Sequence, residues 1–239
     1  MNLPPTPHTS KEYDQQLARA RGLVLQMGAR VERQLVDAIE CLASGSSVLI
    51  DEVMGHETLI NALERSIDEL CSQVIARRQP TATDLRELIA FIKTTTDLER
   101  VGDEAKKIAL QARKILTDGG LYLPRYVEVR HMAHVVRQML RDALDALERK
   151  SVEHTASVVR RDDQVNDAFR AILRQLISFM IEDPRTIGPC LDILFVAKAL
   201  ERIGDHAKNI AEYVVYAVKG KDVRHGSLAD IEREIGSPD

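Results

Sequence analysis

A twelve-residue segment occurs twice in this chain, and its repetition constrains the fold more than any other feature of the sequence. LERVGDEAKKIA at 98–109 and LERIGDHAKNIA at 200–211 are identical at nine of twelve positions and lie 102 residues apart. A looser match, offset by 106 residues, relates 57–70 to 163–176. The 239-residue chain is therefore expected to contain two copies of one helical unit.

Apolar residues recur at helical spacing in every long segment, and no stretch alternates with the period of two typical of a strand. Breaks at 43–47, 79–84, 117–124, near Ser151 and at 182–189 separate six long helices, with Gly119, Gly120 and Pro124 in the third break. We expect an all-α protein of two tandem three-helix bundles, at 13–119 and 124–219. A flexible tail at 1–12 is expected before them, and a tail at 220–239, with one short helix or partial disorder, after them.

Each copy of the segment places two acids one helical turn apart. Apolar residues in alternating steps of three and four predict a core-facing stripe on the third and sixth helices. At 100° per residue, Glu99 and Asp103 fall opposite that stripe, as Glu201 and Asp205 do in the second copy. Like charges at this spacing destabilise a helix by a few tenths of a kcal/mol, so their repetition needs an explanation.

Metal ions would offset this repulsion, because paired carboxylates supply the oxygen ligands that hard cations prefer. The candidate ions are divalent or iron-type (Mg, Mn, Fe or Zn), and the sequence does not choose among them. Lys107 stands where the second copy has Asn209, so the first site is expected to bind metal differently or less strongly. The predicted ligands, on the motif helices and the helices expected beside them, are Glu57, Asn61, Glu99, Asp103, Asp163, Asp167, Glu201, Asp205 and Asn209.

Composition and motifs argue against several functional classes. A net charge of −4 and 4% aromatic residues do not favour nucleic-acid binding. The chain has no Gly-rich phosphate loop, no G-x-S-x-G and no H-E-x-x-H, and its one Glu-x-x-His, Glu128 with His131, does not make a di-metal centre. A non-enzymatic protein is favoured. Two alternatives stay open. One is a carboxylate-bound metalloenzyme. The other is a structural scaffold whose acids are merely solvated and paired with Arg100 and Arg202.

The chain is expected to be cytoplasmic. Its first residues lack the apolar run of a signal peptide, and no segment has 18 uninterrupted apolar residues, so direct membrane insertion is not expected. Its three separated cysteines fit a reducing compartment.

These motifs resemble the PhoU family. The family has two three-helix repeats, each with Glu-Arg-x-Gly-Asp in its third helix, and AKALERIGDHAKNIAEYVVYAVKGKDVRH at 197–225 resembles its C-terminal signature. The resemblance implies a cytoplasmic, non-enzymatic negative regulator of phosphate uptake and of the phosphate-starvation response. Such a regulator acts as an adaptor between a phosphate ABC transporter and a membrane sensor histidine kinase.

The resemblance also implies a homodimer, and metal ions on surface Glu/Asp-x-x-x-Asp motifs. Four residues match that motif directly: Glu99, Asp103, Glu201 and Asp205. The other five predicted ligands rest on the alignment of the repeats and on the expected adjacency of the helices.

Overall fold

The computed structural model describes residues 11–44, 46–117, 127–224, 226 and 228–236. These residues form α-helices, a short 3₁₀ turn (Pro184–Thr186) and no strand, which confirms the all-α prediction and the six long helices. Residues 1–10, Gly119, Gly120 and Pro124 lie outside the described residues. The helices are α1 (Lys11–Ser44), α2 (Ser47–Arg78), α3 (Ala82–Thr117), α4 (Val127–Arg149), α5 (Thr155–Glu182), α6 (Ile187–Lys219) and α7 (Leu228–Gly236).

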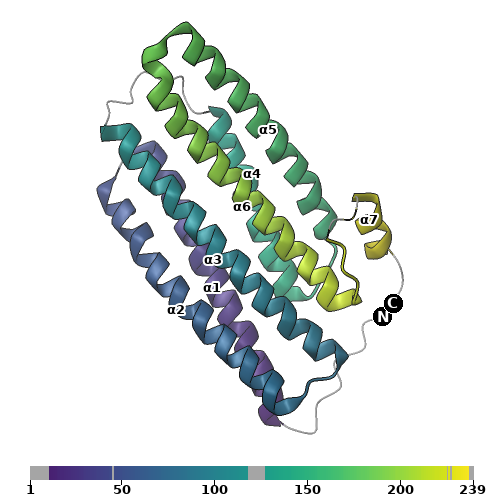
Figure 1. Ribbon diagram of the computed structural model, residues 1–239. Helices are drawn as coiled ribbons and strands as arrows, with labels where there is room; N and C mark the ends of the chain where they lie inside the picture. Colours follow the sequence, from purple (N-terminus) through teal and green to yellow (C-terminus); the bar gives the residue numbers. More distant parts are fainter. Residues whose placement is uncertain (1–10, 45, 118–126, 225, 227, 237–239) are drawn as a thin grey trace.

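The two repeats pack against each other along α3 and α6, which form the most extensive helix contact of the molecule. These helices lie side by side in the middle of the view, and α2 and α5 form its two edges (Figure 1). They run antiparallel: Lys114, near the end of α3, pairs with Asp192, near the start of α6, at 2.6 Å. A second contact between the repeats joins α1 to α4.

The predicted stripes of α3 and α6 are buried, and they belong to one core. Leu98 and Ile108 of α3, and Leu200 and Ile210 of α6, are all fully buried. A single apolar cluster takes in side chains from all six long helices. The two three-helix bundles are therefore halves of one packed body.

The pattern of buried residues gives the correct residue-by-residue alignment of α2 with α5. Five buried positions of α2 match five of α5 at an offset of 105 residues: Ile50, Val53, Ile60, Ile67 and Cys71 correspond to Thr155, Val158, Val165, Ile172 and Leu176. The offset of 106 used above is wrong by one residue. It pairs buried Val165 with Leu59, which is 46% exposed, because a one-residue slip rotates a helix face by 100°.

The chain after α6 folds back onto the second repeat. Gly220 ends α6 in the left-handed conformation at φ 74°, and its N–H donates to the carbonyl oxygen of Tyr216 at 2.9 Å. Ile231 of α7 packs with Val159, Val215 and Val223 in a small separate apolar cluster. The tail therefore contains the short helix that was one of its two expected forms.

In the described part of the chain, no helix has both the length and the apolar character needed to cross a membrane.

Candidate functional site

The acids of the motif lie on two strips, each shared by two neighbouring helices. The first strip, between α2 and α3, contains Glu57, Asn61, Glu99 and Asp103, because α2 packs directly against α3. These side chains avoid the core, but the adjacent helix covers them in part. The side chain of Glu99 is 19% exposed and that of Asp103 is 32% exposed.

The second strip lies between α5 and α6 and differs from the sequence-based set. Glu201 and Asp205 are on it, but Asp163 and Asp167 are exposed, and Asp167 pairs with Arg170 of its own helix at 3.0 Å. Asp162, 3% exposed, faces α6 instead. With the 105-residue offset, Asp162 and Asn166 correspond to Glu57 and Asn61. The one-residue error in the alignment concealed them.

Each strip also contains a lysine that the sequence reasoning missed. Lys106 Nζ donates to Glu57 Oε1 at 2.6 Å across α2 and α3. Lys208 Nζ donates to Asp162 Oδ2 at 3.1 Å across α5 and α6. A signal was present in the sequence, because lysine is the ninth residue of both twelve-residue copies.

The other motif acids also have basic neighbours. Arg100 lies 3.6 Å from Glu99 and 3.7 Å from Asp103, and Lys198 Nζ lies 2.5 Å from Glu201 Oε2. The pairing of Arg100 with nearby acids therefore occurs as the scaffold interpretation expected.

Burial, together with repulsion among the acids, shifts the pKa values of Glu99 and Asp205 upward. Desolvation, followed by the charge of Asp103, raises the pKa of Glu99. Desolvation, followed by Glu201 and Asp162, raises the pKa of Asp205.

The donor set does not fit a preformed metal site. Among the residues that the structure describes, no three His, Cys, Asp or Glu side chains are grouped so that they could hold a metal ion. The acids that α2 and α5 contribute, Glu57 and Asp162, both accept from an ammonium group. Metal binding by the nine residues named from the sequence stays a prediction.

Lys107 and Asn209, expected to distinguish two metal sites, make different contacts. Lys107 Nζ donates to Glu104 Oε1 within α3 at 2.8 Å. Asn209 Nδ2 donates to Asp97 Oδ1 of α3 at 3.2 Å. Both acids lie at the α3–α6 contact, so this difference between the repeats concerns how they pack together.

The glycines of the motif make room for neighbouring side chains. A Cβ atom at Gly102 would lie 3.0 Å from Gln34 Oε1, and one at Gly204 would lie 3.4 Å from Val165 Cγ1 and 3.8 Å from Asp162 Oδ1. Gln34 Oε1 and Asp162 Oδ1 are both buried without a hydrogen-bond donor. Gly102 thus lets a polar oxygen of another helix approach the motif helix, whereas a Cβ atom at Gly204 would make only ordinary contacts.

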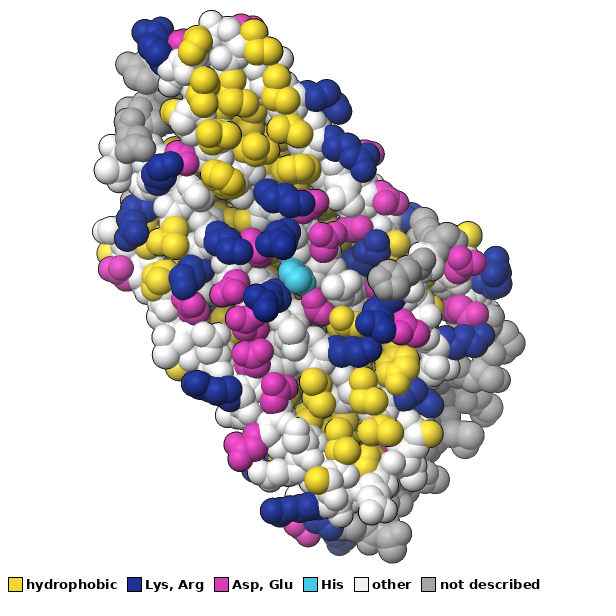
Figure 2. Space-filling view, in the orientation of Figure 1, with side chains coloured by type: hydrophobic (Ala, Val, Ile, Leu, Met, Phe, Trp, Pro, Cys, Tyr) yellow, Lys and Arg dark blue, Asp and Glu magenta, His cyan; other side chains and the backbone are white. Residues whose placement is uncertain are grey.

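Charged side chains join α3 to α6. Arg202 Nη1 donates to Glu104 Oε1 at 3.1 Å, and His206 Nδ1 lies 2.6 Å from Asp97 Oδ1. Figure 2 shows acidic and basic side chains forming a belt across the middle of the face over these two helices, with apolar side chains gathered on either side of it. The belt contains both acidic and basic side chains, so it is not a general anion- or cation-binding surface.

A polar pocket of about 380 Å³ adjoins the second strip. Asp205, Lys208, Asn209, Glu212, Tyr213, Arg224 and Gly226 line it. Glu212 is 4% exposed, and burial raises its pKa to about 7, with Lys208 acting in the opposite direction. The first repeat has Leu110 at the position of Glu212, so a titratable group at this place is particular to the second repeat.

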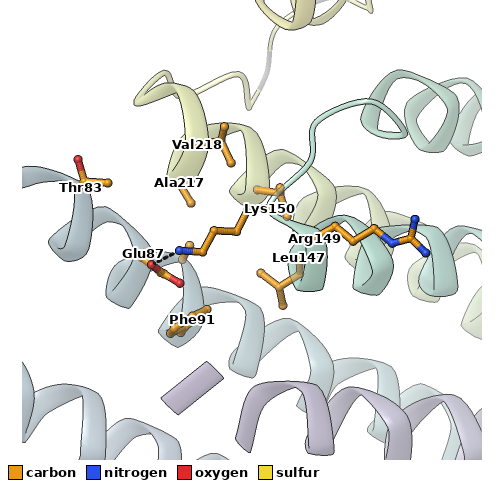
Figure 3. Close-up of a pocket in the computed structure, with 10 residues that line it drawn as sticks. Thr83, Glu87, Phe91, Leu147, Arg149, Lys150, Ala217 and Val218 are labelled. Atoms are coloured by element: carbon orange, nitrogen blue, oxygen red, sulfur yellow. Dashed lines mark hydrogen bonds and ion pairs between the residues drawn. The ribbon is translucent and has the colours of Figure 1, made fainter. Parts of the chain in front are cut away.

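A second pocket, of about 410 Å³, lies where α3, α4 and α6 meet. Phe91, Leu147 and Val214 contribute apolar surface to it. Lys150, at the end of α4, extends across to Glu87 of α3, and their charged groups lie 2.8 Å apart (Figure 3). Arg21 of α1 also pairs with Glu87, so this pocket marks an ionic junction between the repeats rather than part of the acidic motif.

The turn between α5 and α6 carries an exposed apolar patch. It consists of five residues that are 39–77% exposed: Ile177, Ile181, Ile187, Leu191 and Phe195. Spacing of four residues keeps those on each helix on one face. The equivalent residues of the first repeat are Ser72, Ala76, Leu85, Ile89 and Lys93, so the patch is more apolar than its counterpart.

Comparisons with known proteins agree with the two-repeat organisation. The PhoU domain model matches residues 24–112 and 129–214. The chain is 44% identical to the phosphate-specific transport system accessory protein PhoU homolog of Pseudomonas putida, over 96% of this chain and 90% of that protein. It is 38% identical to the phosphate-specific transport system accessory protein PhoU of Escherichia coli K12, over 97% and 95%.

A solved structure has the same fold. The crystal structure of PhoU from Pseudomonas aeruginosa superimposes with a TM-score of 0.85 at 42% identity, covering 87% of this chain and all of that one. These relatives are named as accessory proteins of phosphate transport, not as enzymes. With two matched domains and relatives similar along nearly its whole length, the chain belongs to the PhoU family.

Proposed function

We propose that this protein is a cytoplasmic, non-enzymatic adaptor that represses phosphate uptake and the phosphate-starvation response when phosphate is plentiful. It binds a component of a phosphate ABC transporter and, through a separate surface, a membrane sensor histidine kinase. Relatives named as accessory proteins of phosphate-specific transport support the transporter as a partner.

The observation that carries the proposal is the apolar patch on the α5–α6 turn. Ile181 is 77% exposed and Phe195 is 55% exposed, and exposed apolar residues grouped in this way are typical of protein-docking surfaces. The patch is the docking surface for the transporter component. An adaptor needs such a surface. The first repeat has Ala76 and Lys93 at the positions equivalent to Ile181 and Phe195, so its α2–α3 turn is less apolar.

The test replaces Ile181 and Phe195 with glutamate in the full-length protein. We expect the variant to lose capture of the transporter's cytoplasmic subunits in a pull-down and to leave a phosphate-starvation reporter active in phosphate-rich medium. Leu59→Glu on α2 is the control, because Leu59 is 46% exposed and outside the patch. Unchanged capture by the patch variant would contradict the assignment.

The family resemblance also suggests a homodimer, which sedimentation of the same variants can test. If the patch variant changes only the oligomeric state and still captures the transporter, the patch joins two copies of the chain and the transporter docks elsewhere.

A further inference from the structure

The two strips contain the same basic group in the same place. Lys106 and Lys208 are equivalent at the 102-residue offset of the motif helices, while their partners, Glu57 and Asp162, are equivalent at the 105-residue offset of α2 and α5. Both ammonium groups bridge two helices, at 2.6 Å and 3.1 Å from the carboxylate oxygen. The arrangement therefore recurs in three dimensions as well as in sequence.

The Lys208 side chain of the second strip is 32% exposed and lies next to buried acids. Asp162 is 3% exposed and Glu212 is 4% exposed. The ammonium group of Lys208 thus lies against the carboxylate of Asp162, between α5 and α6, at 3.1 Å.

We infer that Lys106 and Lys208 are tethered counter-ions that occupy the cation positions of the two strips and keep divalent metal ions out of them. A carboxylate that accepts from an ammonium group at this distance has already exchanged water for a cation. A divalent ion bound to the same carboxylate would face the ammonium charge a few ångströms away in a partly buried setting, where repulsion is strong. Metal binding by the strips is therefore weak as long as the lysines remain.

The test removes the charge of each lysine and keeps an unbranched side chain that is one atom shorter. After treatment with EDTA, full-length wild type, Lys106→Met and Lys208→Met are titrated with MnCl₂, and free Mn²⁺ is followed by electron paramagnetic resonance. We expect each variant to bind Mn²⁺ at least roughly tenfold more tightly than wild type. The double variant should bind two ions, and Mn²⁺ should raise its melting temperature more than that of wild type.

Three further variants distinguish the effect of the charge from the effect of its position. Lys106→Arg and Lys208→Arg retain the positive charge and should bind Mn²⁺ as weakly as wild type. Lys107→Met removes the same charge one residue along α3, but Lys107 pairs with Glu104 away from the strip, so its affinity should not change. Circular dichroism confirms folding, and glutamine takes the place of methionine in any variant that does not fold.

The inference fails if the methionine variants bind Mn²⁺ within about twofold of wild type. It also fails if Lys107→Met gains as much affinity, or if the purified wild type already holds a stoichiometric divalent ion on either strip. Because the readout is metal affinity alone, these outcomes are independent of whether the protein docks onto a transporter.

Discussion

The two repeats keep the same acidic motif, but they differ where they face each other. Glu104 in the first copy corresponds to His206 in the second, and Lys107 corresponds to Asn209. If the second copy had kept the glutamate of the first at position 206, two acids would meet across the contact, because residue 206 faces Asp97. The actual pairs, Arg202 with Glu104 and His206 with Asp97, join unlike groups. The copies have diverged at this contact and have stayed alike on the strips.

The outer surfaces differ in another way. The α5–α6 turn has exposed isoleucine and phenylalanine where the first repeat has small, partly buried or charged residues, and the polar pocket with Glu212 adjoins the second strip. The second repeat thus carries more of the surface features that a partner could recognise.

Truncating equivalent residues of the two core stripes should have the largest effect. Leu98→Ala and Leu200→Ala each remove a fully buried side chain, and each should lower the free energy of unfolding by about 3 kcal/mol. Since the repeats share one core, urea denaturation should show one transition for both variants. Two separate transitions, or a cost at only one of the sites, would show that the repeats are independent bundles.

Glu212 should make the second repeat sensitive to pH. Its pKa of about 7 in the folded protein lies above the ordinary value of 4.5, so the folded state holds this proton more tightly than the unfolded chain. The stabilisation is complete below pH 4.5 and is lost as the pH rises through 7. Glu212→Gln should therefore be more stable than wild type at pH 8 by roughly 2–3 kcal/mol, with little difference at pH 4.

The control for this prediction is Asp163→Asn, which removes an exposed carboxyl group nearby on α5. Thermal melts of the three proteins across this pH range provide the measurement. Parallel curves for wild type and Glu212→Gln would rule out a buried, proton-holding carboxyl group at this position.

Replacing each motif glycine with alanine should change the free energy of unfolding differently in the two repeats, by about 1 kcal/mol. At Gly204 the new Cβ would make ordinary contacts, so alanine should stabilise the helix by up to about 1 kcal/mol. At Gly102 it would lie 3.0 Å from Gln34 Oε1, and Gln34 is held in place by its bond to the carbonyl oxygen of Val53 at 3.1 Å. That crowding should cancel the gain. Chemical denaturation that shows equal gains would mean that Gln34 moves aside freely.

The smallest effect is expected at Lys198. Its ion pair with Glu201 is partly solvated, and the first repeat has Thr96 at this position. Lys198→Ala should cost about 0.5 kcal/mol or less, measured by the same denaturation. A loss comparable to that of Leu200→Ala would mean that the pair is part of a larger network.

The fold was predictable from the sequence because helical periodicity and the doubled segment are local signals. The stripe through Leu200 lies on one helix, and its facing follows from 100° per residue. The contact between α3 and α6 was not predictable in this way. The residues that form it, such as Asp97 and His206, are polar and far apart in the chain, and no periodic pattern identifies them.

The candidate site was predicted in part. The four acids of the motif lie on strips between neighbouring helices, and their role as metal ligands stays a prediction. The sequence could not supply the register of α5, and a one-residue error selected Asp163 instead of Asp162. The sequence also could not show that Lys106 pairs with Glu57 and Lys208 with Asp162. Which side chains meet between two helices depends on how the helices pack.

The shared core has a consequence for how such a chain could arise. A protein with only one repeat would leave the inter-repeat faces of its first and third helices uncovered, and it could bury them only against another copy of itself. Its folded state would then depend on concentration. Joining two copies in tandem makes that association intramolecular, so the present chain completes its core at any dilution, and each half is free to acquire residues that a symmetric pair would have had to carry twice.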